Sequence, residues 1–367
     1  MSRIVVDARF INSSTGRYCL RLLQNLEKID HKNEYIVLIP RKDKNYYVPK
    51  AKNFRVEFAD WKLSSFGEQF AFNKFLKNLK ADLVHFCIPQ QPIFYRKNKI
   101  TTMHDLTLFR TWNSNKNWLI YHAKQTVARY VFWRVARDSA RVICPSEFTA
   151  RDIEKFAHIS PDEIDMIYEA ADYSDKSAKS FKKLKYKKFL LYVGQQTDYK
   201  NLVRLAKAHQ KLLKKFPDLG LVFVGRISNT SQRGVKSFTE NNNYKNIQFT
   251  GYISDKERNY LYQNAAAYVF PSLMEGFGLP ALEAMINGAP VISSNATCLP
   301  EVCGNAAEYF DPKNIDEMAN VISRVLSDDK LRAKLIKLGY EKVKEYSWEK
   351  CARETLESYE KVLKTAK

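Results

Sequence analysis

Apolar stretches typical of buried strands alternate with helical stretches along almost the whole chain, and this alternation restricts the fold more than any other feature. The strands expected in the first half span 4–7, 35–39, 54–58, 83–86, 99–103 and 141–144. Helices are expected between them at about 17–29, 66–79, 117–137 and 146–156. The strands expected in the second half span 189–193, 220–224, 246–249, 266–270, 289–293 and 308–310. Strands that alternate with helices indicate an α/β fold with parallel sheets.

The chain length favours two domains over one. The chain has 367 residues, whereas single domains usually contain about 100–200. The polar run Ser174–Ser180 and the Lys-rich residues after it have the composition of a linker. We therefore expect an N-terminal domain over 1–175, a linker over 176–188, a C-terminal domain over 189–346 and a final helix within 347–367. Ser347 is a suitable N-cap for that last helix.

Composition predicts a globular protein in a reducing compartment. Hydrophobic residues make up 45% of the chain, which is enough for packed cores and argues against disorder. No run approaches the roughly 18 apolar residues of a membrane span, and Met1 is followed directly by a strand, so we expect no signal peptide. The six Cys contain no C-x-x-C pair. Buried free thiols in the cytoplasm are the better interpretation, and we expect no metal site and no cofactor.

The positive charge is concentrated in the first part of the chain. The net charge is +20, and residues 1–150 hold 26 Lys and Arg against 12 Asp and Glu, a net +14. A basic surface favours anionic partners such as nucleic acid, an anionic membrane or a phosphorylated substrate. No nucleic-acid-binding motif accompanies the charge, so we expect no nucleic-acid partner. A lysine-rich background composition would give the same charge, and that alternative stays open.

Aromatic and basic residues are interleaved around the helix expected at 117–137. The aromatic residues are Trp112, Trp118, Tyr121, Tyr130, Phe132 and Trp133, and the basic residues are Lys116, Lys124, Arg129, Arg134 and Arg137. An apolar helix face flanked by cations is typical of helices that bind a membrane surface. A helix that packs on a sheet in the core has the same pattern, and both interpretations stay open.

The segment Glu275–Glu283, with the sequence E-G-F-G-L-P-A-L-E, follows an apolar strand. Pro280 is favoured at the start of a helix, so the glycines before it form a turn between strand and helix. The backbone N–H groups expected to point out of this helix start belong to Phe277, Gly278 and Leu279. An anion is favoured there by the helix dipole, and the carboxylates of Glu275 and Glu283 on either side can bind hydroxyl groups. The segment therefore suits a nucleotide sugar, although an ordinary turn with two solvated glutamates has the same pattern.

This segment resembles the signature of the retaining GT-B glycosyltransferases, in particular the large bacterial mannosyl- and glucosyltransferase family (glycosyltransferase family four-like). In that family two glutamates are separated by seven residues, as Glu275 and Glu283 are. The resemblance spans essentially the whole chain and implies two Rossmann-like domains that face each other across a cleft. It also implies that the N-terminal domain receives the acceptor, that the C-terminal domain binds the donor, and that the last helix crosses back to the N-terminal domain.

The resemblance assigns two sites in the N-terminal half. Gly16 follows the first strand and matches the glycine loop that faces the donor phosphates, although a single glycine there is also an ordinary turn. His104 follows another strand and matches a histidine that contacts the transferred sugar, so it is expected to be catalytic together with Glu275. Asp105 is expected either to orient His104 or to cap the next segment. An ordinary hydrogen-bonded histidine is the alternative for His104.

The resemblance also assigns donor-binding residues in the C-terminal half. Lys200 matches the lysine that binds the pyrophosphate, but the arginine that usually precedes it is missing. Arg226 is the candidate second cation, with an ordinary solvent-facing arginine as the alternative. Tyr252 and Ile253 match the turn that holds the nucleotide base through its backbone. Glu283 is expected to bind the ribose hydroxyls, while Glu275 and the amides after it hold the sugar.

Together these matches imply a retaining, metal-independent glycosyltransferase that uses a nucleotide diphosphate sugar, with GDP-mannose favoured. The implied acceptor is a glycan or lipid-linked glycan in surface polysaccharide or lipopolysaccharide synthesis. A cytoplasmic protein that associates with the inner face of the membrane is expected. The alternatives are a UDP-sugar-dependent glucosyl- or N-acetylhexosaminyltransferase, or a relative that binds nucleotide sugars without transferring them.

Overall fold

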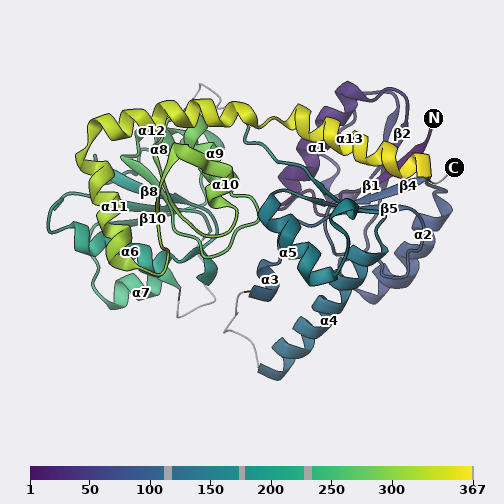
Figure 1. Ribbon diagram of the computed structural model, residues 1–367, viewed down its shortest axis with the longest axis horizontal. Helices are drawn as coiled ribbons and strands as arrows, with labels where there is room; N and C mark the ends of the chain where they lie inside the picture. Colours follow the sequence, from purple (N-terminus) through teal and green to yellow (C-terminus); the bar gives the residue numbers. More distant parts are fainter. Residues whose placement is uncertain (111–117, 173–177, 227–233, 366–367) are drawn as a thin grey trace. The chain divides into compact units, whose positions relative to one another are not determined.

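The structure is a computed structural model that describes residues 1–110, 118–172, 178–226 and 234–365 (Figure 1). These residues divide into two compact units. Unit 1 holds 1–109, 118–169 and 347–365, and unit 2 holds Arg110, 170–172, 178–226 and 234–346. Each unit is built on one parallel sheet, so the two-domain α/β architecture expected from the sequence is confirmed.

Unit 1 contains a seven-stranded sheet in the order β3-β2-β1-β4-β5-β6-β7. Its strands are β1 (Arg3–Asp7), β2 (Glu34–Ile39), β3 (Phe54–Phe58), β4 (Leu83–Phe86), β5 (Lys99–Thr102), β6 (Arg141–Cys144) and β7 (Ile164–Met166). Its helices are α1 (Gly16–Ile29), α2 (Asn73–Asn78), α3 (Thr107–Arg110), α4 (Trp118–Asp138), α5 (Glu147–Ala157) and α13 (Trp348–Thr365). Residues 66–78 are helical, as expected for 66–79, and a π-helical turn at Glu68–Phe72 lies within this run before α2.

The C-terminal helix α13 packs on unit 1, where it lies against α1 (Figure 1). The Tyr359 hydroxyl lies 2.6 Å from His85 Nδ1 on β4. Ser358 donates a 2.7 Å hydrogen bond to the carboxylate of Asp165 on β7. Tyr359 and Ser358 are completely buried, so these contacts anchor the tail to the middle and the edge of the sheet.

Unit 2 contains a six-stranded sheet in the order β10-β9-β8-β11-β12-β13. Its strands are β8 (Phe189–Val193), β9 (Gly220–Val224), β10 (Ile247–Gly251), β11 (Ala267–Phe270), β12 (Val291–Ser294) and β13 (Ala307–Phe310). Its helices are α6 (Leu202–Leu212), α7 (Val235–Asn241), α8 (Asp255–Asn264), α9 (Leu279–Ile286), α10 (Leu299–Cys303), α11 (Ile315–Ser327) and α12 (Asp329–Lys342). The central strands are buried along their whole length, as parallel strands covered on both faces should be.

The strand order reverses once in each sheet, and these points place the candidate sites. In unit 1 the reversal lies between β1 and β4, and in unit 2 it lies between β8 and β11. Ligands of open parallel sheets bind beside the carboxyl ends of the strands at such a switch point. The loops after β8 and β11 in unit 2 contain Lys200 and Glu275, the two residues to which the sequence assigns phosphate and sugar.

The segment expected as a linker, 176–188, has contacts with unit 2 among its described residues. The chain passes from unit 1 to unit 2 directly after Glu169. Within residues 178–188, several lysines form hydrogen bonds through their backbone with other residues of unit 2. The backbone N–H of Lys179 donates to the Lys256 carbonyl at 3.1 Å, and Gln248 bonds to the backbone of Lys183 and Lys185. Residues 174–177, with most of the serine-rich run, lie outside the described residues.

Candidate functional site

Lys200 and Glu275 form an ion pair at the switch point of unit 2. Lys200 Nζ lies 2.6 Å from Glu275 Oε1, and the two side chains are only 12% and 11% exposed. The ammonium also lies 4.9 Å from the ring centre of Tyr199 and 5.7 Å from that of Phe270, which adds cation–π attraction. The two residues that the sequence assigns to different parts of one ligand are therefore in direct contact.

The loop that carries Lys200 is held by the residue after it. Asn201 has a left-handed backbone, with φ of 61°, which asparagine tolerates better than most residues. Its buried side-chain amide donates to the carbonyl groups of Pro271 (3.0 Å) and Pro312 (2.6 Å), which follow β11 and β13. The Tyr199 carbonyl accepts a 2.8 Å hydrogen bond from the N–H of Leu273. These bonds tie the Lys200 loop to the loop that leads to Glu275.

The loop that carries Glu275 is held by the segment after β12. The Glu275 N–H donates to Thr297 Oγ1 at 3.2 Å, and the Cys298 thiol donates to the Glu275 carbonyl at 3.3 Å. Thr297 has a positive φ of 59°, which is unusual for a β-branched residue and shows that the surroundings fix this turn.

The turn after Glu275 has the predicted form. Gly278 is the N-cap of α9 and has a φ of 100°, which favours glycine. A Cβ atom at this position would also lie 2.8 Å from the Leu299 side chain. The helix begins at Leu279, and Pro280 is its second residue. The ring of Phe277 is buried and packs at a centroid distance of 5.7 Å on Tyr346.

Glu283 lies on α9 and is held from α8. Its side chain is 10% exposed. The Tyr262 hydroxyl donates to Glu283 Oε2 at 3.3 Å, and Arg258 Nη2 lies 3.8 Å from Oε1. Arg258 also pairs with Asp255 at 2.9 Å. Arg258 and Tyr262 therefore fix the orientation of Glu283, and sequence reasoning did not identify either of them.

Close backbone contacts join the ends of β8, β9 and β10 beside the ion pair. The Gly225 N–H donates to the Gly251 carbonyl at 3.1 Å, and a Cβ atom on Gly225 would lie 2.1 Å from the Gly194 carbonyl oxygen. Arg226 follows Gly225 and is exposed. Tyr252 follows Gly251, and its side chain is 80% exposed. Ile253, the other residue assigned to the base, is half-buried.

His104 lies in unit 1 after β5, and the structure identifies its partners. Its Nδ1 lies 3.0 Å from Glu169 Oε1, and its Nε2 lies 3.0 Å from the Cys87 carbonyl oxygen. Asp105 does not orient His104. Its carboxylate accepts a 2.7 Å hydrogen bond from the N–H of Thr107 and so caps α3, the second of the two roles expected for it. Sequence reasoning missed Glu169, because its partner lies 65 residues away.

Gly16 has a structural role in the turn before α1, and its assignment to the donor phosphates stays a prediction. A Cβ atom there would lie 2.1 Å from the Ile11 carbonyl oxygen, so the chain's own backbone already occupies the space beside Gly16. Its N–H donates to Ser13 Oγ at 3.1 Å. The turn before α1 therefore requires a residue without a side chain at position 16. The same turn provides a hydrogen-bond acceptor for the N–H of Gly16.

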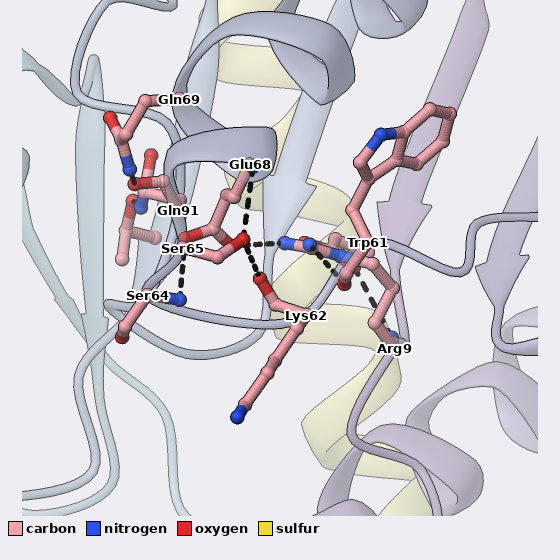
Figure 2. Close-up of polar contacts among 10 residues, drawn as sticks. Arg9, Trp61, Lys62, Ser64, Ser65, Glu68, Gln69 and Gln91 are labelled. Atoms are coloured by element: carbon pink, nitrogen blue, oxygen red, sulfur yellow. Dashed lines mark hydrogen bonds and ion pairs between the residues drawn. The ribbon is translucent and has the colours of Figure 1, made fainter.

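A buried ion network lies beside β1 in unit 1 (Figure 2). Arg9 pairs with Asp7 at 2.8 Å and with Glu68 at 2.7 Å, and each of these side chains is at most 2% exposed. The Arg9 guanidinium also donates to the Trp61 carbonyl and stacks on Phe72 at 3.8 Å. Burial raises the pKa of Glu68 despite the attraction of Arg9. These bonds make the network a structural anchor between β1 and the π-helical turn.

The aromatic and basic stretch divides into a buried and an exposed part. Phe132 near the end of α4 packs in the core of unit 1 with residues that include Met103 and Val142. Val127 and Tyr130, earlier in the helix, are 64% and 54% exposed. Trp112, Lys116 and the side chain of Trp118 lie outside the described residues.

The described residues contain neither a helix able to cross a bilayer nor a cluster of metal-ligand side chains, and one expectation about the cysteines is confirmed. No described helix is long and apolar enough to cross a bilayer. Within the same residues, no three His, Cys, Asp or Glu side chains gather as metal ligands would. All six cysteines are buried and free, as the sequence predicts.

Comparison with known proteins defines the class as a glycosyltransferase. Residues 15–175 match the Glycosyltransferase Family 4 domain, and residues 174–342 match the domain of Glycosyl transferases group 1. O-antigen chain mannosyltransferase B of Escherichia coli is 31% identical over 287 residues, which cover 73% of this chain and 72% of that protein. O-antigen chain mannosyltransferase RfbU of Salmonella typhimurium is 27% identical over 65% of this chain and 66% of its own length. The chain belongs to the glycosyltransferase family that includes these O-antigen mannosyltransferases.

Solved structures share the GT-B fold at low sequence identity. Sucrose-phosphate synthase from Thermosynechococcus elongatus matches with a TM-score of 0.78 and 18% identity over the full length of both chains. WaaG, a glycosyltransferase involved in lipopolysaccharide biosynthesis, matches with a TM-score of 0.71 and 14% identity over 96% of this chain and 98% of its own. Anabaena HepE in complex with UDP-glucose matches with a TM-score of 0.73 and 15% identity over 98% of this chain and 100% of its own.

Proposed function

We propose that this glycosyltransferase transfers mannose from GDP-mannose to a glycan or lipid-linked glycan during synthesis of a surface polysaccharide. The observation that carries the proposal is the buried pair of Lys200 and Glu275 at the switch point of unit 2, because it places a cation and a carboxylate where a parallel sheet binds its ligand. The two O-antigen mannosyltransferases among the relatives support mannose as the sugar.

In this proposal the candidate residues of unit 2 bind the diphosphate, the sugar, the ribose and the base of the donor. Lys200 binds the diphosphate, and Glu275 with the amides at the start of α9 binds the sugar. Glu283, whose orientation is fixed from α8, accepts hydrogen bonds from the ribose hydroxyls. Tyr252 and Ile253 bind the base at the end of β10, and Arg226 is the second cation beside the phosphates. Lys200 exchanges Glu275 for a phosphate oxygen when the donor binds.

The proposed chemistry retains the configuration of the sugar and needs no metal ion. The bond between the anomeric carbon and the phosphate oxygen breaks, and the acceptor oxygen bonds to the same face of that carbon. The acceptor proton passes to the departing phosphate oxygen. Lys200 stabilises the charge that develops on the leaving group, where a preorganised cation has its largest effect.

We also propose that the acceptor is presented at an anionic membrane surface. Residues 1–150 carry a net charge of +14, and Val127 and Tyr130 are exposed on α4. Basic residues with exposed apolar side chains are typical of proteins that bind membrane surfaces without spanning them. His104 contributes to sugar binding from unit 1 in this proposal.

A donor screen tests the proposed function. The purified protein is mixed with GDP-mannose, UDP-glucose and UDP-N-acetylglucosamine in turn, and released GDP or UDP is measured with and without a lipid-linked glycan acceptor. GDP release that depends on acceptor, continues in EDTA and conserves the anomeric configuration supports the proposal. Turnover of a UDP-sugar alone would replace mannose by glucose or N-acetylhexosamine. Binding of donors without any turnover would identify a non-transferring relative.

A further inference from the structure

His104 is held between two hydrogen-bond acceptors. Its Nδ1 faces the Glu169 carboxylate and its Nε2 faces the Cys87 carbonyl, both at 3.0 Å. A carbonyl oxygen and an ionised carboxylate can only accept, so each ring nitrogen must carry a proton to form its bond. Only the imidazolium form of histidine carries both protons. The two contacts therefore select the charged form of His104.

Several other titratable groups of the described residues lie around this pair. The titratable groups that face the pair come from several elements: Tyr18 on α1, His85 on β4, Cys87 after β4, Asp105 after β5 and Cys351 on α13. Burial raises the pKa of Tyr18, Cys87 and Cys351, and burial lowers the pKa of His85 to about 3. These four groups therefore stay neutral between pH 6 and 9.

The balance of forces on His104 itself favours the charged form. Burial lowers its pKa, but the hydrogen bond and the negative charge of Glu169, together with the Cys87 carbonyl, raise the pKa above the ordinary 6.5. The side chain of His104 remains 17% exposed, whereas that of Glu169 is 6% exposed. The ring can thus reach a ligand while its counter-ion stays covered.

Glu169 lies at a point where the chain passes between the two units. Glu169 is the last residue of unit 1 before the chain passes to unit 2, and Ser347 is the first residue after the chain returns. Trp348, next to Ser347, packs on Tyr18 at a centroid distance of 6.4 Å, and Tyr18 contacts the His104 ring edge-on at 4.9 Å. The groups around His104 therefore include residues at both of these chain passages.

We propose that Glu169 is a positioning residue that keeps His104 in its imidazolium form and fixes its ring for the glycosyl transfer. His104 then acts on the transferred sugar as a fixed positive charge and cannot act as a base, because both of its N–H groups are directed at protein acceptors. Glu169 touches no substrate atom and acts only through His104. This inference rests on the proposed function for its kinetic consequences, but the charge state of His104 does not depend on it.

A nuclear magnetic resonance titration tests the charge state without any substrate. The chain has six histidines, so side-chain ¹⁵N signals can be assigned, with His104→Gln to identify the signal of His104. Both ring nitrogens of His104 should carry protons at pH 7 in the natural protein. In Glu169→Gln the negative charge is lost, and the amide NH2 can donate to an unprotonated Nδ1 while Nε2–H still donates to the Cys87 carbonyl, so the signal should change to that of a neutral imidazole. A neutral His104 in the natural protein, or an unchanged titration in Glu169→Gln, would overturn the proposal.

The kinetic test separates positioning from general stability. At a pH above the pKa of His104 in both the natural protein and Glu169→Gln, each unit by which the substitution lowers that pKa reduces the imidazolium fraction about tenfold. Glu169→Gln should therefore lower kcat about tenfold or more at pH 8 and less at pH 6, with the donor KM changed by less than about threefold. The alkaline limb of the pH profile should move to lower pH.

Two comparisons complete the design. Glu27→Gln is the matched control, because Glu27 is also a buried carboxylate of unit 1, bonded to Tyr47 and to the backbone of Lys50. It should lower thermal stability and leave the pH profile unchanged. In a His104→Gln background, Glu169→Gln should add little further loss, because it acts through His104. Additive losses, or an equal shift of the pH profile in Glu27→Gln, would overturn the proposal. If the natural protein turns over no donor, the proposed function fails, and the titration still decides this inference.

Discussion

Lys200 and Glu275 depend on each other for charge compensation, because both side chains are almost nine-tenths buried. Removing one partner of a buried ion pair typically costs about 3–5 kcal/mol, since the remaining charge stays buried without compensation. A diphosphate that binds Lys200 must therefore leave Glu275 with new hydrogen bonds, and sugar hydroxyl groups can supply them. In the proposed function, phosphate recognition and sugar recognition are therefore coupled through this contact.

Glu275→Gln separates sugar handling from nucleotide binding. The amide keeps the shape of the side chain but loses its charge, so transfer should fall about 100-fold or more, while GDP affinity should not fall, because Lys200 no longer has to leave a charged partner to bind the diphosphate. Steady-state kinetics and calorimetry with GDP measure the two quantities. Glu240→Gln is the control, since Glu240 is an exposed carboxylate of unit 2 that pairs with its helical neighbour Lys236. A loss of only a few-fold in transfer rate would remove Glu275 from the catalytic role.

Lys200→Ala tests which cation binds the diphosphate. Loss of a charge-assisted hydrogen bond should weaken GDP binding by about 1.5–3 kcal/mol, whereas Arg226→Ala should have a much smaller effect because Arg226 is exposed. Calorimetry on both variants measures this, with Lys211→Ala on the exposed face of α6 as control. An equal loss in Arg226→Ala would mean that the two cations share the phosphates. Unchanged affinity in both variants would locate the phosphate site elsewhere.

At the scale of whole elements, the central strands were predictable and the polar edges were not. Runs such as Phe189–Val193 are apolar throughout because both faces of the sheet are covered. β7 was not predicted, because its three residues centre on Asp165, whose partners Arg141 and Ser358 come from distant segments. The π-helical turn within the helix expected at 66–79 was not predicted for a similar reason, because Glu68 in this turn accepts a hydrogen bond from the distant Arg9.

The candidate site shows the same division between local and distant information. Glu275, Lys200 and His104 could be found because each follows a strand in a short motif. Glu169 and Arg258, which hold His104 and Glu283, stand in no such motif. Their role depends on partners brought close only by folding. A single sequence does not contain that pairing in any local pattern.

Gly278→Ala tests the turn that starts α9. An alanine would have to adopt a φ of 100° and would place its Cβ 2.8 Å from Leu299, so the free energy of unfolding should fall by about 1–3 kcal/mol. Urea unfolding measures the change. Gly67→Ala is the control, because Gly67 has a φ of −58° and a Cβ atom added there would lie 3.5 Å from its nearest neighbour, a side-chain atom of Trp61. This substitution should change the free energy of unfolding by less than about 0.5 kcal/mol. Equal stability of both variants would mean that the turn relaxes and is not fixed by glycine.

At the scale of the whole molecule, the positive charge of residues 1–150 and the exposed residues of α4 both belong mainly to unit 1. The N-terminal part of α4 extends beyond the other elements of unit 1 in Figure 1. Val127 and Tyr130, near the middle of the helix, are exposed. The later half is anchored in the core through Phe132. A helix with exposed apolar residues and Lys124 nearby is suited to contact an anionic surface.

Membrane association should therefore be peripheral, sensitive to salt and dependent on α4. Each Lys or Arg near an anionic bilayer contributes on the order of 1 kcal/mol, and this attraction is screened as salt rises. The protein should co-sediment with anionic but not neutral vesicles, and high salt should release it. Lys124→Glu with Tyr130→Ser should weaken binding about tenfold or more, whereas Lys211→Glu on unit 2 makes the same charge change on another surface and should have little effect. Equal recovery in the supernatant with both lipids would mean that the charge reflects a lysine-rich background, and a soluble glycan would then replace the lipid-linked acceptor.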